Sequence, residues 1–64
     1  MGITEFELVM LRRLWRYGNL KAELCTPQEE SALNRLCLKG EAVKHGVGRS
    51  TYWTPMNGSE SRQR

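Results

Sequence analysis

Hydrophobic residues recur every three or four positions in the first third of the chain, as they do on one face of an α-helix. The pattern begins after Thr4, which forms with Glu7 the Thr-x-x-Glu signature of a capping box, and it stops at Gly18. It predicts a helix over residues 5–17. The apolar positions cover a broad arc, and only a narrow basic stripe with Arg12, Arg13 and Arg16 is left for solvent. The arc consists of Phe6, Leu8, Met10, Leu11, Leu14, Trp15 and Tyr17.

A second, very short helix is expected next, followed by a longer third one. Leu20 and Leu24 are four positions apart, so they can point inward together from barely more than one helical turn. The third helix has the stronger start signal. Thr26 stands at the cap, Pro27 at the first helical position and Glu29 three residues after the cap.

The third helix is predicted to run to Lys39 and to stop at Gly40. Its helical period divides it into two faces. The inward face consists of Ala32, Leu33, Leu36 and Cys37, and the outward face of Ser31, Asn34, Arg35 and Leu38.

Beyond Gly40 the pattern changes to that of β-strands. Residues 42–44 form a short strand, residues 45–48 hold two glycines that permit a tight turn, and residues 50–54 are rich in β-branched and aromatic residues. A two-stranded hairpin closed by Pro55 is therefore expected. The predicted fold class is α+β, with three helices and a C-terminal β-hairpin.

Length and composition limit the chain to one small domain. With 64 residues, of which 39% are apolar, it can pack one core over residues 1–56, whereas residues 57–64 lack apolar side chains and are expected to form a flexible polar tail. Cys25 and Cys37 do not make the disulfide framework of a small secreted domain, so we expect reduced thiols and a cytoplasmic location. No apolar run approaches the ~20 residues of a membrane span.

The net charge of +3 is unevenly distributed along the chain. Residues 44–64 carry four basic residues against one Glu. A basic segment beside glycines and aromatic residues suits a polyanionic partner, although ordinary solvated charge explains it equally well.

The order of helix, short helix, capped helix and glycine-tipped hairpin resembles the winged helix-turn-helix domain over residues 4–55. The most specific part is Ala-Leu-Asn-Arg-Leu-Cys-Leu-Lys-Gly-Glu-Ala-Val-Lys followed by Gly-Arg-Ser-Thr-Tyr-Trp-Thr-Pro. The resemblance implies a double-stranded DNA-binding regulator, of the size that phages and mobile elements encode. It implies that the third helix lies in the major groove and that the hairpin, or wing, contacts phosphates.

The candidate DNA contacts belong to the third helix and the wing. Asn34 matches an adenine edge and Arg35 a guanine edge, and basic wing residues beside flexible backbone suit phosphates, although plain solvation of these polar faces is the alternative. The candidate set is Gln28, Ser31, Asn34, Arg35, Lys39, Lys44, His45, Arg49 and Ser50. Trp15 and Trp53 are expected in the core, and the arginine stripe on the first helix is expected to face solvent.

A second function class is a protein-binding module that blocks or recruits a host protein. Glu29 and Glu30, at the start of the third helix, would repel DNA phosphates and favour this alternative. The broad arc of the first helix also predicts a homodimer through that helix.

Chemistry at a catalytic or metal site is not expected. Cys25, Cys37 and His45 leave a tetrahedral metal site one ligand short. The sequence contains no Asp and one His, and no nucleophile stands beside a plausible base. The expectation is a protein without cofactor or metal that binds and does not catalyse.

Overall fold

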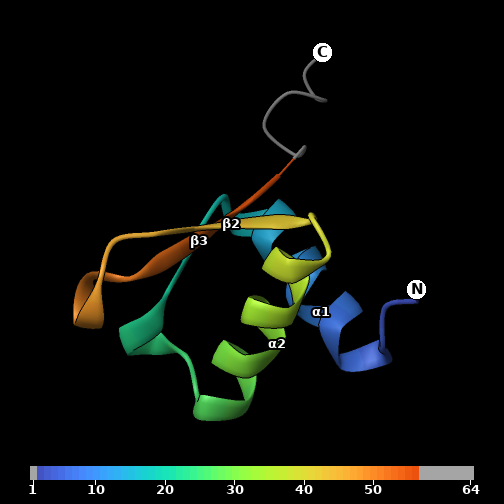
Figure 1. Cartoon of the computed structure of the whole chain (residues 1–64), viewed down its shortest axis with the longest axis horizontal. Coiled ribbons are helices and arrows are strands. Elements are labelled where there is room, and N and C mark those ends of the chain that lie inside the picture. The colour runs from blue at the N-terminus through green and yellow to red at the C-terminus, as the bar shows by residue number, and fades with distance from the viewer. Residues whose placement is uncertain (1, 57–64) are drawn as a thin grey trace.

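The computed structural model describes residues 2–56, and in it two α-helices pack on one side of a small antiparallel sheet (Figure 1). The predicted α+β class is confirmed. The elements in chain order are α1 (Glu5–Tyr17), β1 (Leu20–Lys21), the 3-10 turn η1 (Ala22–Leu24), α2 (Pro27–Leu38), β2 (Ala42–His45), the 3-10 turn η2 (Gly48–Ser50) and β3 (Tyr52–Pro55). The predicted tail, residues 57–64, lies outside the described residues.

Both α-helices begin at the predicted capping boxes. The Thr4 hydroxyl accepts from the Glu7 amide at 3.2 Å and the Glu7 carboxylate accepts from the Thr4 amide at 3.2 Å, and the same reciprocal pair joins Thr26 and Glu29. These bonds satisfy amides that the first helical turn leaves without partners. At the other end of α1, Gly18 adopts the expected left-handed conformation, with φ 84°.

The predicted short second helix is only partly right. Leu20 and Lys21 are extended and pair with β3, opposite Trp53 and Tyr52, so the sheet has three strands in the order β1-β3-β2 and not two. Their backbone groups find hydrogen-bond partners in β3 that one isolated helical turn does not provide. The remaining turn, η1, leaves Leu24 79% exposed, so Leu24 does not point inward with Leu20 as predicted.

The β2–β3 hairpin has a longer tip than expected. Ser50 belongs to η2, and β3 begins only at Tyr52, opposite His45. Gly46 fixes the path of the chain through this tip. It has φ 79°, and a Cβ there would lie 2.6 Å from the carbonyl oxygen of Ser50, so a larger residue would have to displace the backbone.

The core lies between the two helices and the inner side of the sheet. Its buried hydrophobic residues are Met10, Leu11, Leu14, Ala32, Leu33, Leu36, Ala42 and Trp53. The prediction for α2 is confirmed at three positions, with Cys37 half-buried. The prediction for α1 is too broad, because Trp15 remains 54% exposed. No helix within residues 2–56 is long and apolar enough to cross a membrane.

Candidate nucleic-acid interface

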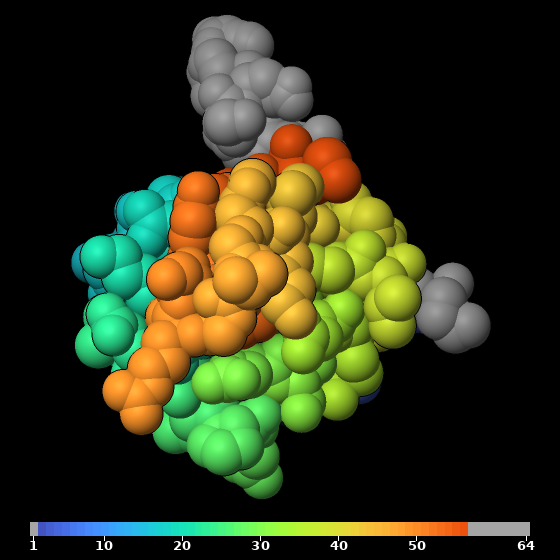
Figure 2. Space-filling view, turned by 60° about the vertical axis from the view of Figure 1, so that its left-hand side comes forward, coloured from blue at the N-terminus to red at the C-terminus, as the bar shows by residue number. Residues whose placement is uncertain are grey.

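The exposed side of α2, called here the α2 outer face, carries most of the predicted DNA contacts. Figure 2 shows α2 and the β2–β3 hairpin beside each other on one side of the molecule, in agreement with the packing of α2 against β2. The outer face consists of the exposed residues Gln28, Ser31, Asn34, Arg35 and Leu38. The last of these is 88% exposed.

Below this face lies a buried carboxylate that sequence reasoning treated only as a cap. Glu7 is 1% exposed. Its Oε2 accepts from Nε of Arg35 at 2.5 Å, and its Oε1 accepts from Nζ of Lys39 at 2.5 Å. The signal for burial was present in the sequence. Glu7 stands three and four positions before Met10 and Leu11, at the start of the buried stripe of α1.

The two cations control the ionisation of Glu7. Hydrogen bonds from Lys39 and then from Arg35 lower the pKa of Glu7 to about 2, against the opposing effect of burial. Glu7 is therefore a carboxylate over the whole physiological pH range. Glu7 also neutralises part of the charge of Arg35 and Lys39, two of the cations that the sequence predicts to contact DNA.

Arg35 and Lys39 differ in how many of their hydrogen-bond donors remain available to a ligand after they bind Glu7. Lys39 is 24% exposed, and its Nζ also donates to the carbonyl of Gly2 at 3.0 Å, so it is directed toward α1 and not toward the outer face. Arg35 is 49% exposed and gives Glu7 only its Nε. The planar guanidinium has two further nitrogens, which this hydrogen bond leaves available to a ligand.

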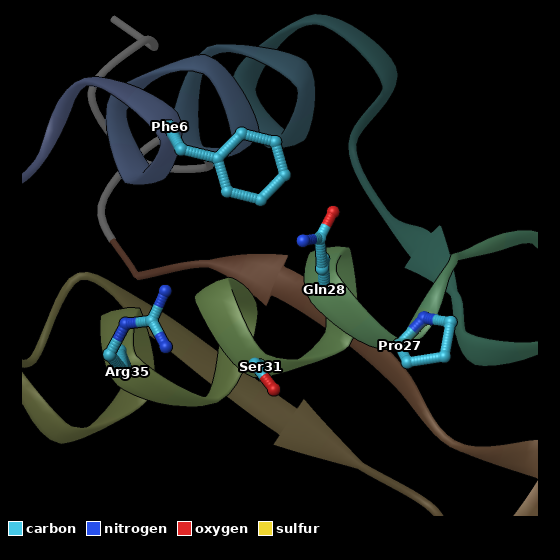
Figure 3. A pocket seen from close by; sticks show the side chains of 5 residues that line it. All are labelled: Phe6, Pro27, Gln28, Ser31 and Arg35. Carbon is cyan, nitrogen blue, oxygen red and sulfur yellow. The ribbon is translucent and has the colours of Figure 1, made fainter.

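Arg35 also lines a groove of about 620 Å³ between α1 and α2. Figure 3 shows Phe6 from α1 facing Gln28 from α2, with Arg35 and Ser31 further along α2. Pro27 completes the lining. The groove combines one aromatic ring with a cation and neutral polar groups.

The wing residues Lys44 and His45 lie on opposite sides of the sheet. Lys44 is opposite Trp53 in the register and its Nζ lies 6.0 Å from the centre of that ring, on the side that packs on the helices. His45 stacks on Tyr52 with 4.8 Å between ring centres and shares a 2.9 Å hydrogen bond with Thr54. Neighbouring strand residues point to opposite faces, so one flat ligand cannot contact both side chains.

Lys44 lies beside α2. Burial raises the pKa of the Cys37 thiol, and the nearby charge of Lys44 opposes this increase in pKa. Cys37 is one turn beyond Asn34 on α2. A phosphate bound by Lys44 would therefore lie next to the outer face.

The other predicted wing residues, Arg49 and Ser50, belong to the exposed turn η2. Arg49 lines a depression of about 490 Å³ together with Glu23 of η1 and Glu30 of α2. Glu30 precedes Asn34 by one helical turn. Arg49 and Lys44 thus flank Asn34 from its two ends, and two carboxylates reduce the positive potential at Arg49.

The second carboxylate at the start of α2 faces away from the hairpin. Glu29 forms an ion pair with Arg13 of α1 at 3.0 Å. The hydrogen bond from the Thr26 amide, and then the one from Arg13, lower the pKa of Glu29. Of the two acidic residues predicted to oppose DNA, only Glu30 lies on the side of the wing.

Cys25 and Cys37 are half-buried free thiols. Burial raises the pKa of both Cys25 and Cys37, which keeps their thiols protonated. Neither forms a disulfide. Within residues 2–56 no group of three or more His, Cys, Asp or Glu side chains is arranged to hold a metal ion.

No family model, curated protein or solved structure matches the chain. The function is therefore inferred from the geometry of the site. That site is the α2 outer face between Lys44 and Arg49, with Arg35 held from below by Glu7.

Proposed function

We propose that this chain is a small winged-helix protein that binds double-stranded DNA as a regulatory factor, with α2 in the major groove and the β2–β3 hairpin as the wing. Two α-helices separated by the strand β1 and the 3-10 turn η1, and followed by a glycine-containing hairpin, support the fold. The helix expected to enter the groove buries Ala32, Leu33 and Leu36 and exposes Ser31, Asn34 and Arg35.

The observation that carries the proposal is the position of Asn34. It is exposed in the middle of the α2 outer face, with Lys44 beside one end of this segment and Arg49 beside the other. An amide can pair with both groups of an adenine edge, and flanking cations can neutralise phosphates on the two sides of the groove. A merely solvated helix needs no such arrangement.

The exposed polar and basic residues divide the contacts between base edges and phosphates. Asn34 and Ser31 contact base edges, and Arg35 offers its two terminal nitrogens to a guanine edge or to a phosphate while Glu7 holds its Nε. Lys44 and Arg49 bind phosphates. Lys39 and His45, which the sequence also suggested, are assigned no DNA contact because each is engaged elsewhere.

Phosphate contacts can be tested with a matched pair of lysines on opposite sides of one sheet. Lys44→Ala should weaken binding to a random duplex at all sequences and reduce the slope of log affinity against log salt by about 0.9, measured by fluorescence anisotropy between about 50 and 200 mM salt. Lys21→Ala is the control, because Lys21 is opposite Tyr52 on the other side of the sheet. Equal effects of the two variants would contradict the assigned orientation.

Base contacts require a selected duplex. Asn34→Ala should cost about 1–3 kcal/mol of binding free energy on that duplex and relax discrimination at one base pair. Glu30→Gln should tighten binding, because it removes a carboxylate beside Arg49. If selection from random duplexes enriches no sequence and the wild type shows no salt-dependent binding, the proposed function is wrong.

A second candidate, docking of a protein segment on the same face, is favoured by two observations. Leu38 is 88% exposed, and Phe6 lines the groove beside Arg35. Leu38→Ser separates the two candidates. It should leave the affinity for random duplex unchanged if phosphates dominate that binding, and it should abolish capture of a protein that inserts an apolar side chain there.

A further inference from the structure

The side of α1 that faces away from the core is unusually apolar for a surface. Of the ten large hydrophobic residues that are exposed within residues 2–56, five lie on this one helix of 13 residues. They are Phe6, Leu8, Val9, Trp15 and Tyr17, of which Trp15 is 54% and Tyr17 62% exposed. Leu8, Val9 and Trp15 lie on the side opposite the core, whereas Phe6 lines the groove with α2. Concentration of large apolar side chains on one element is typical of a surface that another molecule covers.

The charges on this side are separated along the helix. Glu5 is exposed in the first turn, and Arg12 and Arg16 are exposed in the second half. Glu5 and Arg16 are eleven positions apart, about three turns, so they lie on one line along the helix. Val9 lies between them on the same side. Arg13 is directed to Glu29 and does not belong to this line.

We propose that two copies of this chain pair through α1, antiparallel to each other about a twofold axis that passes close to the middle of the helix. In this register Glu5 of each copy lies opposite Arg16 of the other copy, which gives two equivalent ion pairs. Leu8 of each copy packs on Trp15 of the other. Val9 of each copy lies near the centre, opposite Arg12 of the other copy.

We infer a second copy of the chain as the partner because the charges of α1 are complementary to those of another α1 when the two helices are antiparallel. Parallel helices would place Glu5 against Glu5 and Arg16 against Arg16. In a twofold pair of antiparallel helices each residue in the first half meets a residue in the second half, so acid meets base twice. The exposed apolar residues occur in both halves and meet each other by the same symmetry.

The contact area predicts a weak dimer. A helix of 13 residues is about 20 Å long. One helix pair of this length buries an area at or below the low end of the roughly 1,200–2,000 Å² that stable interfaces bury. We therefore expect dissociation in the micromolar range. Arg12 lies near the proposed axis, close to Arg12 of the second copy, and opposes association.

The dimer does not rest on DNA binding and is tested without DNA. Sedimentation equilibrium of the full chain, from about 10 to 500 µM, should show a monomer–dimer equilibrium. Glu5→Lys and Arg16→Glu should each weaken association by about tenfold or more, because each turns two attractive pairs into repulsive ones. The double variant, with both changes, should restore it.

Three controls make the result decisive. Circular dichroism establishes that each variant is folded, and Lys21→Glu, which reverses a charge on the outer side of the sheet, should leave association unchanged. Arg12→Gln should tighten the dimer. A wild type that stays monomeric at about 500 µM, or single variants that associate as the wild type does, would overturn the proposal. Failure of the double variant to recover, with both single variants folded and monomeric, would overturn the antiparallel register.

Discussion

The two α-helices start with the same four-residue signature and use it differently. Thr4 and Glu7 open α1, and Thr26 and Glu29 open α2, with the same reciprocal hydrogen bonds. Yet the side chain of Glu7 is 1% exposed and binds two cations of α2, whereas that of Glu29 is 19% exposed and binds one cation of α1. The local motif is identical, and the tertiary environment is not.

The difference shows that a capping carboxylate can serve a second purpose when the helix start is covered by another element. At the start of α1, Glu7 links the cap to Arg35 and Lys39 of α2 and thereby orients a residue of the proposed DNA-binding face. At the start of α2, Glu29 remains near the surface, where solvent screens its ion pair. We expect the two carboxylates to differ in stability, in pH dependence and in their effect on binding.

The largest effect is expected from shrinking a core side chain of α2, the helix that carries both cationic partners of Glu7. Leu36 is fully buried on α2, next to Arg35. Leu36→Ala should cost about 2–5 kcal/mol of unfolding free energy, through lost burial and a residual cavity. For a domain of this size that is enough to unfold much of the population. Urea denaturation midpoints measure it. A cost below about 1 kcal/mol would show that burial of Leu36 does not hold α2 in place.

Exchanging the two carboxylates for amides tests the comparison directly. Glu7→Gln should lower the melting temperature much more than Glu29→Gln, since the buried amide nitrogen would face one of the two cationic donors, which then has no acceptor there. Glu29→Gln removes a surface pair and should cost about 0.2–1 kcal/mol. Melting followed by circular dichroism compares the pair. Similar losses would mean that burial of Glu7 contributes nothing beyond the cap.

The pH dependence of stability should follow Glu7. Lys39 and Arg35 lower its pKa from an ordinary value of 4.5 to about 2. Above pH 4.5 the group is ionised in both states and its contribution is complete. As the pH falls toward 2, the unfolded chain binds a proton that the folded chain rejects, so stability is lost through this window. Melting temperatures between pH 7 and 2 should fall less steeply for Glu7→Gln than for the wild type.

The smallest effects are expected where the two helix starts are alike. Thr4→Ala and Thr26→Ala each remove one hydroxyl acceptor from an N-cap, and each should cost about 1 kcal/mol. Thermal melting of the two variants is the measurement. A much larger loss for Thr4→Ala would indicate that the cap of α1 also supports the buried ion pairs of Glu7.

Much of the fold could be predicted from the sequence because helix ends are set locally. The capping boxes at Thr4 and Thr26 and the left-handed glycine at Gly18 depend on hydrogen bonds between residues three or four positions apart. The alternation after Gly40 likewise predicted a hairpin. The tip was predicted too short, since the extra turn η2 is closed by backbone hydrogen bonds from Ser50 to Val47 and from Thr51 to Gly48, which residue types alone do not specify.

The candidate site was predicted in its residue types and less well in its geometry. Ser31, Asn34 and Arg49 are exposed as expected. His45 and Lys44 were grouped because they are neighbours in sequence, but adjacent strand residues point to opposite sides once the register is set by β3. Trp15 was expected in the core and is exposed. Helical periodicity identifies the apolar side of a helix, but it does not show how wide a face the rest of a 64-residue chain can cover.

The sequence by itself determined where the helices begin and end, because those hydrogen bonds close within one turn. Only the tertiary structure decided the roles of Glu7, Arg35 and Lys39, since their bonds join residues 28 and 32 positions apart and exist only when α2 packs on α1. The same holds for Leu20, which became a strand because β3 offered it hydrogen-bond partners. Burial and long-range pairing depend on which elements meet, and that is a property of the folded chain.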